Sequence, residues 1–217
     1  ERGQERLGVA FGEGGGEGGG ADNGGGADDV ATLRAYAARL QERFREAFWV
    51  SVDGRRYPAV ALDRDKRAVD SLTSNIGHLL GTGLLTPAEE AEVAALLVAP
   101  DMLSGYGLRT LSASSGGHWP LSYHCGSVWA HDTAIAVDGL LRAGFPDEAR
   151  VLAEQALAQA VATGFRVPEL IGGQDAQAFI DPVRYPTSCF PQAWSAAAIG
   201  AVGRALGAEA GRARAGR

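Results

Sequence analysis

Side chains that could do chemistry are concentrated between Pro120 and Ala134, in the sequence PLSYHCGSVWAHDTA. This stretch holds a tyrosine, two histidines, a cysteine, a tryptophan and an aspartate, and it leads directly into an apolar segment. Three kinds of site use such residues: a metal site, a catalytic pair, or a loop that binds a sugar. The rest of the sequence has to discriminate among them.

Residues of the types that bind sugars recur in loop-like segments and at the helix starts that follow them. Pyranose rings stack on the faces of Trp and Tyr, and sugar hydroxyls need donors and acceptors. The residues concerned are Tyr106, Arg109, Tyr123, His124, Trp129, His131, Asp132, Gln192 and Trp194. We predict that they bind a carbohydrate, with a place in the hydrophobic core as the alternative for each tryptophan.

Glycoside hydrolysis requires two carboxylates, one acting as acid and the other as base or nucleophile. Asp132 and Glu169 are the internal candidates, and Glu169 lies in the segment VPELIGG. A lone glutamate there could also cap a turn. Asp132 lies in the first turn of an expected helix, where a carboxylate stabilises the helix dipole or accepts a hydrogen bond from a sugar hydroxyl. Both interpretations of Asp132 stay open.

A zinc site would use His124, Cys125, His131 and Cys189, since zinc is bound by Cys and His. The spacing is irregular and lacks the paired C-x-x-C or H-x-x-x-H units of strong zinc motifs. We therefore expect no metal. Two cysteines do not make a disulfide framework, although one disulfide remains possible.

Composition argues against several other ligand classes. The net charge is −6 and no basic block stands out, whereas phosphate binding needs clustered Lys and Arg, so we do not expect nucleic acid as a partner. No segment has the length of a membrane span, and the N-terminus lacks a secretory signal. We expect a cytoplasmic protein. Because the sequence begins with Glu, it could be part of a longer chain.

Hydrophobic periodicity predicts an all-α fold. The glycine-rich residues 1–27 are expected to form a flexible linker or an inserted loop. A helix should follow from Asp28 or Asp29 to about Trp49, and an Asp-Gly turn comes after it. The predicted domain covers residues 28–208, and residues 209–217 are expected to be a disordered tail.

Helical pairs are predicted from Val69 onwards. The helix over 131–143 is apolar on most sides and should be buried all round, whereas that over 146–163 has one apolar face. Alternating buried and half-exposed helices indicate an inner and an outer ring, as in an α/α toroid. Two long loops, 98–127 and 166–192, carry most of the candidate residues, and loops of that length tend to be functional.

Five motifs, taken in order, resemble the C-terminal half of the bacterial amylo-α-1,6-glucosidases of the glycogen-debranching type. These belong with a wider group of (α/α)6-barrel glycosidases that includes mannosylglycerate-hydrolase-like and glucoamylase-like enzymes. The motifs are SLTSNIGHLLGTGL, PDMLSGYGLRTLS, SYHCGSVWAHDTAIAVDGL, VPELIGG and YPTSCFPQAWSAAA. This chain departs from the family pattern at Gly81, Cys125 and Ala130.

The resemblance implies a partial (α/α)6 barrel that hydrolyses α-glucosidic bonds of a glucan or glucoside with inversion, without metal or organic cofactor. It implies that Glu169 is the general base and that the general acid lies upstream of this sequence. The residues implied to line the subsite of the cleaved sugar are Tyr123, His124, Trp129, His131 and Asp132.

A complete barrel of this kind needs roughly twelve helices, and this length supplies roughly half to two-thirds of them. We therefore expect the remainder of the barrel to come from upstream sequence, and the 217 residues alone to be inactive or weakly stable. Two other functions stay open. One is a non-catalytic carbohydrate-binding toroid, and the other is a zinc-dependent toroidal enzyme using His124, Cys125 and His131.

Overall fold

The computed structural model describes residues 25–215, with side chains over 29–207. The predicted linker over residues 1–27 therefore lies almost entirely outside the described residues. The chain divides into two compact units, Glu1–Arg39 and Leu40–Arg217, and the candidate site belongs to the second. Helix α1 (Gly25–Phe48) ends where predicted but begins before the predicted cap at Asp28 or Asp29.

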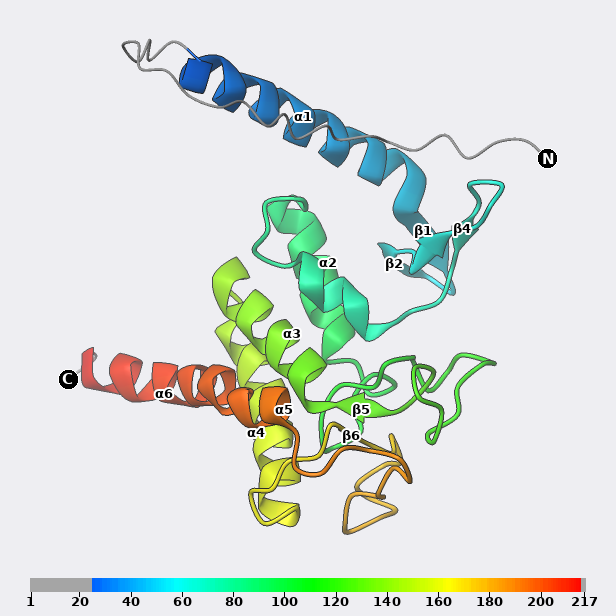
Figure 1. Cartoon of the computed structure of the whole chain (residues 1–217), viewed down its shortest axis with the longest axis vertical. Coiled ribbons are helices and arrows are strands. Elements are labelled where there is room, and N and C mark those ends of the chain that lie inside the picture. The colour runs from blue at the N-terminus through cyan, green and yellow to red at the C-terminus, as the bar shows by residue number, and fades with distance from the viewer. Residues whose placement is uncertain (1–24, 216–217) are drawn as a thin grey trace, which may run out of the picture. The chain divides into compact units, whose positions relative to one another are not determined.

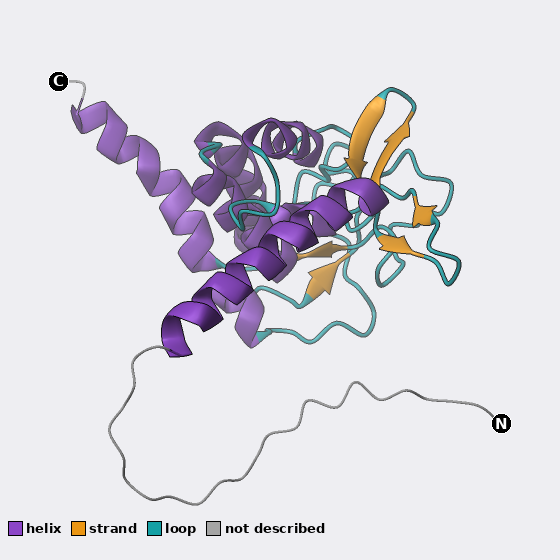
Figure 2. Ribbon diagram, turned by 90° about the horizontal axis from the view of Figure 1, so that it is seen from above, coloured by secondary structure: helices purple, strands orange, loops and turns teal. Residues whose placement is uncertain are grey.

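Short strands follow α1, where only an extended run was predicted (Figure 2). Strands β1 (Trp49–Val52) and β2 (Arg55–Pro58) form an antiparallel hairpin. The predicted Asp-Gly turn is confirmed, because Asp53 and Gly54 both have positive φ, at 50° and 76°. That combination is typical of the type I′ turn, whose twist suits a two-residue hairpin. A second small pair consists of β3 (Ala61–Leu62) and β4 (Ala68–Val69).

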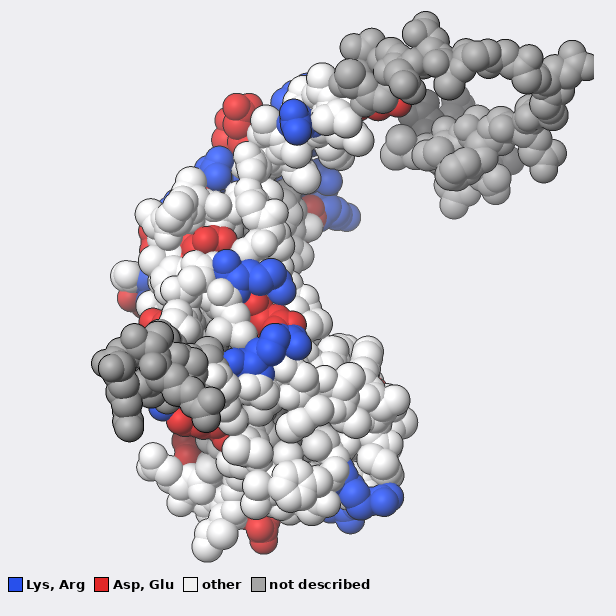
Figure 3. Space-filling model, turned by 90° about the vertical axis from the view of Figure 1, so that its left-hand side faces the viewer, with Lys and Arg blue, Asp and Glu red and all other residues white. Residues whose placement is uncertain are grey.

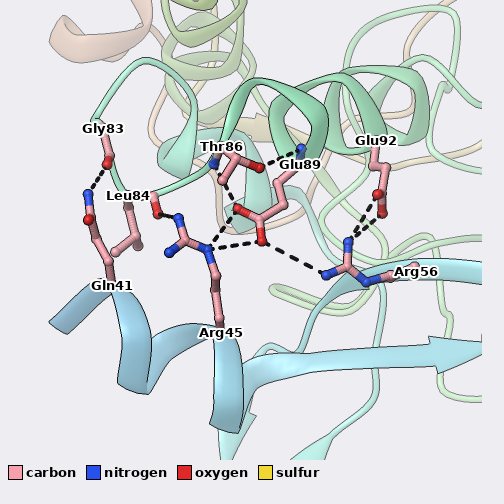
Figure 4. Close-up of polar contacts among 8 residues, drawn as sticks. All are labelled: Gln41, Arg45, Arg56, Gly83, Leu84, Thr86, Glu89 and Glu92. Carbon is pink, nitrogen blue, oxygen red and sulfur yellow. Dashed lines mark hydrogen bonds and ion pairs between the residues drawn. The ribbon is translucent and has the colours of Figure 1, made fainter. Parts of the chain in front are cut away.

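Helix α2 (Pro87–Leu97) is anchored by the buried carboxylate of Glu89 (Figure 4). Glu89 forms a capping box with Thr86 and pairs with Arg45 at 3.2 Å, while Arg56 approaches it at 3.9 Å. Burial by itself would raise the pKa of Glu89, but hydrogen bonds from Thr86 and Arg45 outweigh burial and lower the pKa. One carboxylate thus connects the last turns of α1, the hairpin and α2.

The helical pattern predicted from Val69 onwards does not begin at Val69. Val69 pairs in β4, and only a 3-10 helix, η1 (Ser74–Leu79), forms. Strand pairing and the approach of η1 to α3 outweigh the helical pattern here. A Cβ on Gly77 would lie 2.9 Å from the Cβ of Ala136 in α3. The glycine therefore permits a backbone contact that a larger residue would prevent.

Helices α3 (Ala130–Ala143) and α4 (Pro146–Ala162) form the predicted helical pair (Figure 1). The Gly144 turn is left-handed, with φ at 87°, and Pro146 occupies the first turn of α4 as expected. The expectation that α3 is buried all round is wrong for Ile135, which is 38% exposed. Gln159 of α4 is a polar residue, yet it is buried.

The loop after α4 and the last helices complete the second unit. Strands β5 (Val128–Trp129) and β6 (Leu170–Ile171) pair antiparallel across the α3–α4 hairpin. Two helices follow, α5 (Ala193–Ala197) and α6 (Ile199–Ala215). Because α6 continues to Ala215, the disordered tail predicted from residue 209 is helical over most of its length. The main core joins apolar residues of η1, α2, α3, α4 and α6.

Asp101 fastens the long loop 98–127 to the hairpin. Its carboxylate accepts hydrogen bonds from Arg55, the shorter at 2.7 Å, and from the hydroxyl of Ser112. Burial by itself would raise the pKa of Asp101, but the hydrogen bonds from Arg55 and Ser112 outweigh burial and hold the pKa at about 2. The ionised form is therefore the one that the folded state favours.

We expect Asp101→Asn to reduce the free energy of unfolding by about 2 kcal/mol near neutral pH. Because the pKa of Asp101 in the folded state lies below its ordinary value of 3.8, the ionised carboxylate stabilises the fold at pH values above 3.8. That contribution disappears as pH falls toward 2. Urea unfolding of the intact protein across this range measures the loss. Asp65→Asn, which breaks only exposed ion pairs, is the control. A pH-independent difference between the variants would contradict the prediction.

The surface shows mixed charge. On the face drawn in Figure 3, acidic and basic side chains lie interspersed among uncharged residues, without a continuous basic area over the described residues. A search of the described part of the chain for membrane spans found no helix with the necessary length and apolarity.

Candidate active site

A pocket of about 530 Å³ brings together most of the residues that the sequence singled out. Its walls come from η1, the loop 98–127, the start of α3, the segment before β6, and α5. The lining residues are Val60, Thr73, Ser74, Asn75, Thr110, Tyr123, His124, Trp129, His131, Asp132, Glu169 and Trp194. A larger hollow of about 600 Å³, lined by Leu170, Ile171 and Phe190 among others, contains none of the predicted site residues among its described lining.

Glu169 is held at the pocket by its backbone. Its N–H donates to the carbonyl of Cys189 at 2.9 Å, and the Cys189 N–H lies 3.4 Å from Glu169 Oε2. The next residue, Leu170, pairs with Trp129 in the β5–β6 ladder. The carboxylate therefore has a fixed position beside the aromatic wall, and it is only partly buried. A partly exposed carboxylate held in this way can act on a water molecule in the pocket.

Five aromatic rings form the wall of the pocket. Trp129 is buried, and its indole N–H donates to the Tyr123 carbonyl at 3.0 Å. His124 stacks on Trp129 with ring centroids 5.5 Å apart. His131 stacks on Trp194 at 3.9 Å, and Trp194 remains 46% exposed. A supported but accessible indole is suited to stacking on a sugar ring.

Asp132 is paired with a histidine that the sequence analysis did not assign to the site. His78 Nε2 lies 2.6 Å from Asp132 Oδ1, and this hydrogen bond raises the pKa of His78 above its ordinary value. By contrast, burial lowers the pKa of His131, so His131 is protonated less readily than His78. The His78 side chain is 41% exposed, so it does not lie in the hydrophobic core.

Three predicted substrate-binding residues do not line the pocket. Tyr106 is buried, and its hydroxyl donates to the carbonyls of Phe179 and Ile180. Arg109 is also buried, and its guanidinium donates to backbone carbonyls, including that of Gly173 at 2.8 Å. These two side chains join the long loops to each other. The side chain of Gln192 accepts a hydrogen bond from Ala193 N at the start of α5.

Sequence reasoning missed the polar residues at the start of η1. Thr73, Ser74 and Asn75 line the pocket, together with Thr110 from the long loop. Their signal was a run of polar residues directly before an apolar helical segment, the same arrangement that precedes α3.

The zinc hypothesis has no support in the geometry. Over the described residues, no group of three or more His, Cys, Asp and Glu side chains is arranged to hold a metal ion. Cys125 and Cys189 are exposed and free, so the disulfide left open by the sequence does not form between them.

Comparison with known families decides the class of the protein. The model of the mannosylglycerate hydrolase MGH1-like glycoside hydrolase domain matches residues 21–166. The chain belongs to this family. The matched range of the MGH1-like domain includes the pocket segments up to α4 and does not reach Glu169 or Trp194. A search of curated proteins by sequence found no match.

Two solved structures of longer proteins are similar in fold to this MGH1-like chain. A GH63 mannosylglycerate hydrolase from Thermus thermophilus in complex with Tris is 22% identical, with a TM-score of 0.52. Neutral trehalase Nth1 from Saccharomyces cerevisiae is 19% identical, with a TM-score of 0.59. The mannosylglycerate hydrolase matches 76% of this chain and the trehalase matches 84%. This chain in turn covers only 36% of the hydrolase and 32% of the trehalase. The predicted α/α toroid is confirmed as the fold, and the chain corresponds to about a third of these proteins.

Proposed function

We propose that the chain is part of an inverting glycosidase that hydrolyses α-glucosidic bonds of a glucan or glucoside, with Glu169 as the general base. The observation that carries this proposal is the position of Glu169. A backbone-anchored carboxylate lies in the same pocket as the exposed face of Trp194 and the carboxylate of Asp132. Membership of a glycoside hydrolase family supports the reaction class.

In the proposed reaction, Glu169 takes a proton from a water molecule as the water oxygen attacks the anomeric carbon. The bond from that carbon to the leaving oxygen breaks, and an acid from another part of the barrel protonates the leaving oxygen. Asp132 accepts hydrogen bonds from sugar hydroxyls and does not supply this proton. Its pairing with His78 supports this assignment, because Asp132 Oδ1 is already engaged with His78 Nε2 at 2.6 Å.

The intact protein should cleave at least one α-glucoside and release the glucose whose anomeric carbon is attacked as the β anomer. We would test isomaltose, maltose and trehalose, with mannosylglycerate included because one structural relative is a mannosylglycerate hydrolase. Proton NMR follows the anomer released before mutarotation. Inversion of trehalose releases β-glucose and α-glucose in equal amounts, so the initial release of α-glucose alone from trehalose would exclude inversion. Binding of these sugars without cleavage would favour a non-catalytic carbohydrate-binding toroid.

A further inference from the structure

His78 contributes to the pocket through another residue. It lies on η1, its side chain is 41% exposed, and its Nε2 lies 2.6 Å from Oδ1 of Asp132. The Asp132 side chain is only 13% exposed. One oxygen of a largely buried pocket carboxylate is thus held by an imidazole from a different element.

Close backbone packing fixes the element that carries His78. A Cβ on Gly139 of α3 would lie 2.8 Å from the carbonyl oxygen of Gly77, the residue before His78. Ile76 and Leu80, on either side of this point, are buried in the main core. The imidazole therefore extends from a backbone segment that cannot slide along α3 without losing core contacts.

The second oxygen of Asp132 needs a donor that the described residues do not supply. Asp132 Oδ2 is buried and accepts no hydrogen bond within the described part of the chain. A buried carboxylate oxygen without a partner is costly, so a hydroxyl or water from outside these residues is expected to satisfy it. Asp132 also lines the pocket, where a sugar hydroxyl would be available.

We propose that His78 is a positioning residue, which holds one oxygen of Asp132 and so fixes the carboxylate at the pocket for hydrogen bonding to a sugar hydroxyl. The identity of the ligand rests on the function proposed above, whereas the pairing itself rests on the geometry. His78 acts through Asp132 and takes no part in the bond-breaking step. Its loss should therefore weaken sugar binding more than it slows turnover.

The test compares His78→Leu, His78→Gln and a matched control in the intact protein. Glutamine can place an N–H donor near the position of the imidazole Nε2, whereas leucine cannot. Arg204→Gln is the control, because it breaks another pair to α3, with Asp138 at 2.8 Å, that lies outside the pocket. D-Glucose is the probe, and its binding is followed through the fluorescence of the pocket tryptophans.

We expect His78→Leu to raise the Kd for D-glucose roughly tenfold, the equivalent of one hydrogen bond to a charged group. On a cleaved substrate, KM should rise similarly while kcat changes less than about threefold. His78→Gln should recover most of the loss, and Arg204→Gln should behave as the native protein. Native affinity in His78→Leu, or equal losses in the Leu and Gln variants, would overturn the inference.

A second measurement tests the pairing independently of any sugar. The titration of His78 by proton NMR should give a pKa above the ordinary histidine value, and Asp132→Asn should lower it. If Asp132→Asn leaves the His78 titration unchanged, the positioning role is wrong whatever the sugar experiments show. If the titration responds but the native protein neither binds nor cleaves sugars, the proposed function fails and the sugar-orienting role fails with it.

Discussion

Replacing Glu169 with glutamine should reduce kcat of the intact enzyme by roughly 10²- to 10⁴-fold, the contribution expected of a general base. Glutamine has nearly the same shape and can still accept the hydrogen bond from the Cys189 N–H. It cannot take a proton from water. The affinity for D-glucose should therefore stay within about threefold of the native value, because the aromatic wall is unchanged.

Steady-state kinetics and glucose titration of the same samples separate the two effects. Asp181→Asn is the matched control, since Asp181 lies on the same loop but lines the larger hollow rather than the pocket. If Glu169→Gln retained native turnover, Glu169 would not be the base. A parallel loss of binding and turnover would instead give the carboxylate a structural role.

Gly173→Ala should have the largest effect on stability, with a loss of about 3 kcal/mol, the upper part of the range for overpacked sites. A Cβ at this position would lie well inside van der Waals contact with the carbonyl oxygen of Gly126. The backbone cannot move away easily. Gly173 N–H donates to the Pro120 carbonyl at 2.9 Å, and the Gly173 carbonyl accepts from Arg109 Nε at 2.8 Å.

The same substitution should impair activity, because Gly173 follows β6 and sets the separation between the two long loops. We expect kcat/KM to fall by at least roughly tenfold as Glu169 moves relative to Trp129. Thermal unfolding and kinetics measure the two effects. Gly116→Ala adds the same methyl group at a loop position where only the adjacent residues lie within 4 Å of it. This variant should keep native stability and native kcat/KM. Native stability in Gly173→Ala would contradict the close packing.

Features with local causes were predictable from the sequence. The Asp53–Gly54 turn, the Gly144 stop and the Pro146 start each depend on the conformational preference of the residue itself. The site loop was also found, because aromatic and polar residues clustered before an apolar helix. Seven of the predicted site residues, from Tyr123 to Trp194, do line the pocket.

Features that depend on distant partners were not predictable. Arg109 was assigned to the ligand because it lies on a long loop with other residues of the types that bind sugars, yet loop carbonyls surround its guanidinium. His78 was not assigned to the site, because the aspartate that it reaches lies far along the chain. In both cases tertiary packing brings the partner near. The pattern of residue types along the sequence carries no information about such long-range contacts.

The pairing of β5 with β6 also has a consequence for the order of folding. Because α3 starts directly after β5 and α4 ends shortly before β6, the antiparallel helical hairpin brings the two strands together. Once that hairpin has formed, joining the strands requires little further loop closure. We therefore expect Glu169 and Trp129 to meet early, as part of a contiguous folding segment, rather than after the ring of helices has closed.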